Sequence, residues 1–134
     1  MTTTGTGEQS RSPIFIVGVH RSGTTLLRFM LSTSPRIYIP PESDFIPRFF
    51  GRDPEGRLDK DRIARILHLI FERYRFPKEW QGSPPDPAWF LQKMKAPTPS
   101  AFLDTLYSEY ARQHFAVHCA DTTPIYTSYR QLIH

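Results

Sequence analysis

The spacing of hydrophobic residues changes abruptly near the start of the chain, at a glycine. Residues 14–17 form a continuous apolar run (IFIV) that ends at Gly18, which is typical of a short parallel strand covered on both faces. Residues 24–31 then carry apolar side chains at helical spacing, and Ser34-Pro35 provides a stop signal. The pattern therefore predicts a strand, a glycine-containing loop and a helix, in that order.

Two further apolar segments predict short strands. Residues 37–39 lead into the segment that contains Glu42, and residues 116–119 form the other strand. In open α/β sheets, ligands bind beyond the carboxyl ends of the strands. The sequence therefore places Glu42 at the edge of the sheet where a ligand is expected to bind.

Helical periodicity dominates the middle of the chain. One apolar stripe consists of Ile63, Ile66, Leu67, Ile70, Phe71 and Tyr74. A second consists of Phe102, Leu103, Leu106, Tyr107 and Tyr110. Both stripes are interpreted as the packed faces of helices that cover a core.

Proline residues mark the boundaries of these helices. Pro87, after the capping residue Asp86, predicts the start of a short helix that reaches residue 94. Pro99, after Thr98, predicts the start of the helix that carries the second stripe to about residue 113. Residues 77–87 contain several prolines and are interpreted as a connection, and a last helix is expected after Pro124.

Composition narrows the class of protein. Of the 134 residues, 39% are hydrophobic and 22% are charged, which fits a globular protein with one modest core. Residues 1–12 are rich in Thr, Gly and Ser and are expected to form a disordered tail before a domain that spans residues 13–134. No apolar run approaches the roughly 20 residues of a membrane-spanning helix, and no signal peptide is recognisable. We expect a cytoplasmic α/β protein.

The distribution of charged, histidine and cysteine residues limits the kinds of ligand that we expect. The net charge of +4 comes from basic residues that are spread along the chain, which favours a small anion over nucleic acid. The histidines show no ligand spacing with one another or with Cys119, so no metal site is expected. The single cysteine, Cys119, lies in an apolar segment and is interpreted as a core residue.

The loop between the first strand and the first helix carries the candidate chemistry. Its sequence, GVHRSGTT, spans residues 18–25 and has the glycine spacing of a phosphate-binding loop in the strand-helix setting that such a loop requires. Gly18 and Gly23 let the backbone amides converge on an anion, and the helix adds its positive N-terminal end. The guanidinium of Arg21 and the hydroxyls of Thr24 and Thr25 supply further hydrogen bonds.

One position separates this loop from that of the nucleoside triphosphatases. Thr24 follows the second glycine, where the triphosphatase motif has lysine. No strong candidate is evident for the carboxylate that holds Mg²⁺ at the end of another strand. A nucleotide kinase or triphosphatase therefore remains only an alternative.

A longer stretch resembles a known family. Residues 13–50, PIFIVGVHRSGTTLLRFMLSTSPRIYIPPESDFIPRFF, resemble the amino-terminal region of the sulfotransferases that use 3'-phosphoadenylyl sulfate (PAPS), especially the protein-tyrosine sulfotransferases and their bacterial relatives. The resemblance implies a P-loop-containing nucleotide-binding fold with a parallel sheet flanked by helices. It also implies transfer of a sulfuryl group from PAPS to a hydroxyl or amine, with no metal.

Site residues follow from this resemblance. The residues expected to bind the 5'-phosphosulfate of PAPS are Gly18, His20, Arg21, Ser22, Gly23, Thr24 and Thr25. Arg21 is also expected to stabilise the charge that develops on the leaving phosphate. Glu42 occupies the position of a glutamate in the tyrosine-sulfating branch and is predicted to be the general base. His20 is a weaker candidate for proton transfer.

The chain also departs from the family pattern. Thr122 stands where family members usually have a lysine that contacts the transferred group, and Asp44 stands where the tyrosine-sulfating branch commonly has an arginine. The elements that hold the 3'-phosphate and adenine are expected after residue 134, so the chain is interpreted as the amino-terminal part of a truncated sulfotransferase domain. A non-catalytic remnant that keeps the loop is therefore an alternative, and the acceptor, whether peptide or small molecule, and the oligomeric state are left open.

Overall fold

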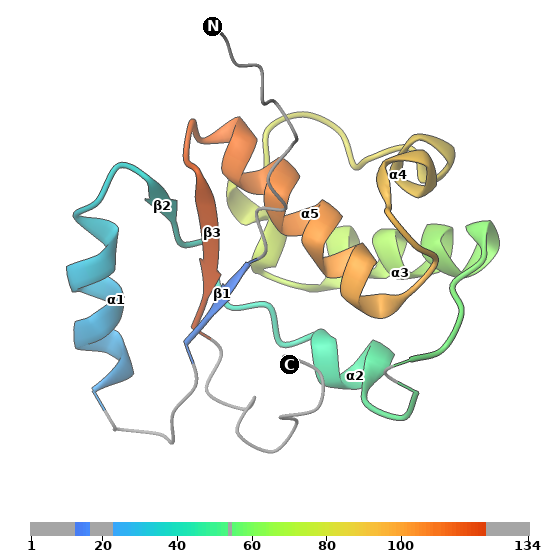
Figure 1. Cartoon of the computed structure of the whole chain (residues 1–134), viewed down its shortest axis with the longest axis horizontal. Coiled ribbons are helices and arrows are strands. Elements are labelled where there is room, and N and C mark those ends of the chain that lie inside the picture. The colour runs from blue at the N-terminus through green and yellow to red at the C-terminus, as the bar shows by residue number, and fades with distance from the viewer. Residues whose placement is uncertain (1–12, 17–22, 54, 123–134) are drawn as a thin grey trace, which may run out of the picture.

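Three parallel strands form the centre of the molecule. The computed structural model describes residues 13–16, 23–53 and 55–122. Among these, β1 (Ile14–Phe15), β2 (Ile37–Tyr38) and β3 (His118–Asp121) form a sheet in the order β1-β3-β2. Helices lie on both sides of the sheet, with α1 (Thr24–Ser32) on one side and α5 (Pro99–Gln113) on the other (Figure 1). The predicted α/β class with a parallel sheet flanked by helices is confirmed.

The last strand in the sequence lies between the other two. On one side of β3, Ile14 is paired with Ala120 and Phe15 with Asp121. On its other side, Ile37 is paired with His118. The Ile16 amide continues the ladder, because it donates to the Asp121 carbonyl at 2.8 Å. The chain therefore brings its first strand and its last described residues together at one end of the sheet.

The position of β3 corrects one prediction. The apolar pattern predicted a strand over residues 116–119, but the paired residues are His118–Asp121. Helix α5 is followed by Phe115 in the left-handed conformation, with φ of 57°, and the amides of Val117 and His118 both donate to the Arg36 carbonyl. These contacts turn the chain, so the regular ladder begins two residues later and extends to the polar Asp121.

The larger core lies on the α5 side of the sheet. It contains α3 (Lys60–Arg73), α4 (Pro87–Lys93) and α5, whose apolar stripes face one another. The most deeply buried members of these stripes are Ile63, Ile70, Phe90, Phe102, Leu106, Tyr107 and Tyr110. Each such side chain contributes about 1.5–3 kcal/mol by its burial. The three predicted helices are therefore confirmed as the walls of the core.

Side-chain caps set where these helices begin. Asp59 accepts a hydrogen bond from the Arg62 amide at 2.8 Å, and Asp86 accepts one from the Trp89 amide at 3.0 Å. The Thr98 hydroxyl accepts one from the Ala101 amide at 3.3 Å. Each cap satisfies a backbone donor that the first helical turn leaves without a partner. The helix starts predicted at Pro87 and Pro99 are thereby confirmed.

Two short helices were not predicted. Helix α2 (Ile46–Phe50) has only five residues, and the 3₁₀ helix η1 (Phe76–Glu79) lies where the prolines indicated a connection. Ile46, Phe50 and Phe76 are all fully buried. Segments this short span about one turn, so they show no helical period, and their conformation depends on the apolar anchors they insert into the core.

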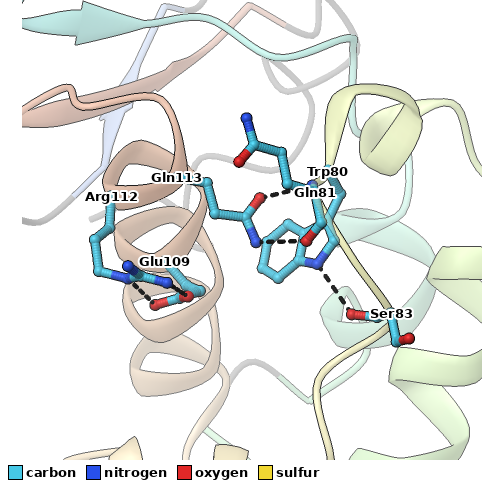
Figure 2. A network of polar contacts seen from close by, with 6 residues as sticks. All are labelled: Trp80, Gln81, Ser83, Glu109, Arg112 and Gln113. Atoms are coloured by element: carbon cyan, nitrogen blue, oxygen red, sulfur yellow. Dashed lines mark hydrogen bonds and ion pairs between the residues drawn. The ribbon is translucent and has the colours of Figure 1, made fainter.

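Polar contacts attach the segment after η1 to the end of α5. The Gln81 amide donates to Gln113 Oε1 at 2.9 Å, and Gln113 Nε2 donates to the Gln81 carbonyl at 3.0 Å (Figure 2). Trp80 Nε1 donates to the Ser83 carbonyl at 3.3 Å and Arg112 pairs with Glu109 in the same region. These contacts stabilise the far end of α5, away from the carboxyl ends of the strands.

Helix α1 covers the other face of the sheet only in part. It spans the predicted segment, and Leu31 packs against a small apolar group formed by Ile16, Ile39 and Ala120. However, Leu26, Phe29 and Met30 are each more than half exposed. Within the part of the chain that the structure describes, the apolar stripe of α1 therefore has only its last turn packed.

Some predictions fall outside the described residues. These are the disordered tail over residues 1–12 and the helix after Pro124. None of the helices in the described ranges is long and apolar enough to cross a membrane.

Candidate functional site

The candidate site lies at the end of the sheet where the strands finish. Strand β1 ends just before the glycine loop, β2 leads into residues 40–44, and β3 ends at Asp121, which is followed by Thr122. All three strands are parallel, so these three segments lie at the same edge of the sheet. This is the edge at which open α/β sheets bind ligands.

Only the end of the glycine loop is among the described residues. Gly23 precedes helix α1 in the left-handed conformation, with φ of 89°. A Cβ added at Gly23 meets no atom of the described residues within 4 Å, so the requirement for glycine comes from the left-handed backbone conformation. The predicted donor residues Gly18, His20, Arg21 and Ser22 lie outside the described residues and remain predictions.

The N-terminus of α1 suits an anion. The first turn contains no acidic side chain, and no side chain caps the helix by a hydrogen bond. Thr25 is exposed, and the backbone of Thr24 forms the first residue of the helix. The positive end of the helix dipole is therefore not offset by a carboxylate of its own first turn.

Glu42 lies beyond the end of β2, as the sequence predicted. Its side chain is exposed, and the structure gives it no hydrogen bond or ion pair with another described residue. The carboxylate is therefore accessible to a second substrate. Its role as a base is not tested by this arrangement and remains a prediction.

Three polar residues are buried at this edge, among side chains that are otherwise mostly apolar. Ser43 is fully buried, Asp121 is 1% exposed, and Thr122 is 6% exposed. Burial of a polar group is unfavourable unless hydrogen bonds replace its contacts with water. The Tyr107 hydroxyl provides one of these bonds, because it donates to Asp121 Oδ2.

Asp44 adds a second carboxylate near Asp121. Its backbone is left-handed, with φ of 54°, and the residue is exposed. Burial raises the pKa of the Asp44 carboxyl, and the negative charge of Asp121 raises it further, while Arg75 lowers it. Among the described residues, this end of the sheet therefore combines the interacting carboxylates of Asp44 and Asp121 with the nearby guanidinium of Arg75.

Sequence reasoning missed the Tyr107–Asp121 pair. Tyr107 was interpreted only as a core residue, and its ring does pack against Phe15 and Phe76, with ring centroids 5.9 Å and 5.1 Å apart. Its hydroxyl, however, reaches the end of β3. The apolar pattern gave no signal for this pair, because Asp121 lies two residues beyond the strand predicted over residues 116–119.

Other predictions concern groups outside this edge. Cys119 is buried in β3, and burial raises the pKa of its thiol, which confirms its interpretation as a core residue. No group of three or more ligand side chains that could hold a metal is found among residues 13–16, 23–53 and 55–122.

Comparison with known proteins adds one family and one relative. A model of the family described as "Sulfotransferase family" matches residues 13–134. A protein of Aquifex aeolicus (strain VF5), named only as an uncharacterized protein, is 37% identical over 76 residues. That match covers 57% of this chain but 8% of the length of the relative. No solved structure matches the chain.

Proposed function

This chain belongs to the sulfotransferase family, and on that basis we propose that it binds PAPS and transfers its sulfuryl group to a hydroxyl or amine acceptor. The observation that carries the proposal is Gly23, held in the left-handed conformation at the N-terminus of α1 and at the ligand-binding edge of a parallel sheet. A strand, a glycine loop and an uncompensated helix N-terminus together suit the phosphosulfate group.

The donor is bound by the loop in this proposal. Backbone amides of residues 18–25 surround the phosphosulfate, and the Arg21 guanidinium forms charge-assisted hydrogen bonds with it. The net charge of +4 supports an anionic ligand. Sulfuryl transfer needs no metal in this scheme, because the guanidinium and the amides stabilise the developing charge.

The acceptor approaches from the side of Glu42. The Glu42 carboxylate takes the proton from the acceptor hydroxyl, and the acceptor oxygen forms a bond to sulfur. The bond between sulfur and the bridging phosphate oxygen breaks, and its electron pair leaves with adenosine 3',5'-bisphosphate (PAP). The exposure of Glu42 beyond β2 supports this role, since a base must be accessible to the second substrate.

One observation favours a weaker alternative, in which the chain binds the donor without turnover. Thr122 stands at the end of β3 and is 6% exposed. A threonine hydroxyl can donate a hydrogen bond to a sulfate oxygen but brings no positive charge. The absence of a cation at this position reduces the expected stabilisation of the transition state by several kcal/mol at most, on the order of one charge-assisted contact.

Calorimetric titration with PAP and PAPS, without Mg²⁺, tests donor binding. We expect Arg21→Ala to weaken binding by about 10- to 100-fold, because it removes hydrogen bonds between charged groups. Arg28→Ala is the matched control, because this substitution removes the same charge from the middle of α1. Preference for ATP with Mg²⁺ over PAP would instead indicate a nucleotide kinase or triphosphatase.

Transfer is tested separately from binding. The chain is incubated with PAPS and a panel of hydroxyl and amine acceptors, and release of PAP is followed. Glu42→Gln should leave PAP affinity unchanged and reduce the rate by about 10²- to 10⁴-fold, the usual contribution of a general base. Tight PAP binding with no release of PAP would favour the binding-only alternative.

A further inference from the structure

Asp121 is a buried carboxylate that the proposed reaction does not use. It is 1% exposed and lies at the last position of β3, at the edge where the donor is proposed to bind. A buried carboxylate is strongly unfavourable unless other groups hydrogen-bond to it. Its position beside an anion site is unexpected for a residue whose only role is packing.

The side chain of Asp121 is held by helix α5. The Tyr107 hydroxyl donates to Asp121 Oδ2, and Tyr107 itself is fully buried. The Tyr107 ring is fixed by an edge contact with Phe15 of β1 and a tilted contact with Phe76 of η1. The hydroxyl therefore has little freedom to move relative to the end of β3.

The backbone of Asp121 is held by β1. Its carbonyl accepts a hydrogen bond from the Ile16 amide at 2.8 Å, in a register that pairs Phe15 with Asp121. Ile16 is the last described residue before the glycine loop, and Thr122 follows Asp121 in the chain. A single residue thus links α5, the strand that enters the loop, and the buried Thr122.

We propose that Tyr107 and Asp121 are positioning residues of the donor site: the Tyr107 hydroxyl fixes the end of β3, and through it Thr122 and Ile16, the last described residue before the glycine loop. This inference rests on the proposed function, because it concerns the same PAPS site. Neither residue touches the donor in this scheme. Their effect comes from geometry, since a small displacement of groups around a bound ligand strongly reduces affinity and rate.

Tyr110 provides a matched control on the same helix. It is also fully buried, and its hydroxyl donates to the Phe76 carbonyl at 2.8 Å and accepts from the Glu79 amide at 3.1 Å. Its ring also packs against Tyr38 of β2, Trp80 at the end of η1 and His114 at the end of α5. Tyr110→Phe therefore also removes a buried hydroxyl from α5, but one whose hydrogen bonds to Phe76 and Glu79 lie in η1 and not at the end of β3.

The experiment compares Tyr107→Phe and Tyr110→Phe in two measurements. Thermal unfolding gives the loss of stability of each variant, and titration with PAP at a temperature where both are folded gives the affinity. We expect both variants to lose stability. Only Tyr107→Phe should also bind PAP more weakly, by about tenfold, because displacement of the end of β3 moves the groups that surround the ligand.

Asp121→Ser is a second variant, in case Tyr107→Phe does not fold. The serine side chain is too short to reach the Tyr107 hydroxyl, so we expect the same loss of PAP affinity as in Tyr107→Phe. Unchanged PAP affinity in a folded Tyr107→Phe or Asp121→Ser variant would overturn the inference, as would an equal loss in Tyr110→Phe. If the unchanged protein does not bind PAP, both this inference and the proposed donor fail.

Discussion

Gly23 and Gly82 allow the backbone requirement of the loop to be measured against an internal control. Both glycines have left-handed backbones, with φ of 89° and 84°, and an added Cβ meets nothing within 4 Å at either position. An alanine in this conformation is strained by about 1–2 kcal/mol. Gly23→Ala and Gly82→Ala therefore introduce the same strain with no difference in packing.

The magnitude follows from two opposing effects. The strain is partly offset by about 0.4–1 kcal/mol, because alanine reduces the conformational freedom of the unfolded chain. A net loss of about 1 kcal/mol remains, which lowers the melting temperature by roughly 3–5 °C for a domain of this size. We expect this shift in both variants.

The affinity for PAP should differ between Gly23→Ala and Gly82→Ala. If the backbone around Gly23 relaxes to relieve the strain, its amides no longer converge on the 5'-phosphate, and PAP should bind at least about tenfold more weakly, the equivalent of about 1.4 kcal/mol. Gly82 lies in the connection after η1, so Gly82→Ala should bind PAP normally. Equal PAP affinity in the two variants, measured by calorimetric titration, would refute the assignment of Gly23 to the donor site.

Three further predictions concern stability. Burial and the charge of Asp121 raise the pKa of Asp44 above its ordinary value of 3.8, so the folded state loses stability as the pH rises through the raised pKa. Asp44→Asn should therefore raise the melting temperature at pH 7 and not at pH 3, and asparagine tolerates the left-handed backbone; equal shifts at both pH values would contradict this account. Phe102→Ala should reduce the free energy of unfolding in urea by about 3–5 kcal/mol, whereas Leu26→Ala, at a site 65% exposed, should change it by less than about 1 kcal/mol; similar losses would show that α1 is covered. Thr98→Ala removes the cap of α5 and should reduce stability by about 1 kcal/mol, with Thr98→Ser as the control that retains the hydroxyl.

Much of the candidate site could be anticipated because it depends on neighbours in the sequence. The step from an apolar run to Gly18, and from Gly23 into helical spacing, identifies a strand, loop and helix without reference to the rest of the chain. The position of Glu42 after the second strand follows in the same way, and the structure places it there. Its chemical role still depends on the resemblance to the family.

The polar interior of the site could not be anticipated. Tyr107 and Asp121 are 14 residues apart, and nothing in the apolar stripe of α5 distinguishes a tyrosine that bonds to a carboxylate from one that only packs. Asp44 likewise gained significance only when β2 and β3 became neighbours, because its carboxyl then experiences the charge of Asp121.

The sequence by itself determined the four longer helices, the caps Asp86 and Thr98, the left-handed glycine before α1 and the resemblance to the family, because each depends on local spacing or on residues that follow one another. Only the tertiary structure decided the strand order β1-β3-β2, the register that joins Ile16 to Asp121, and the start of β3 at His118. It also left most of the apolar stripe of α1 exposed. These features depend on contacts between distant segments, whose free energies are set by packing and burial and do not appear in the local pattern of residues.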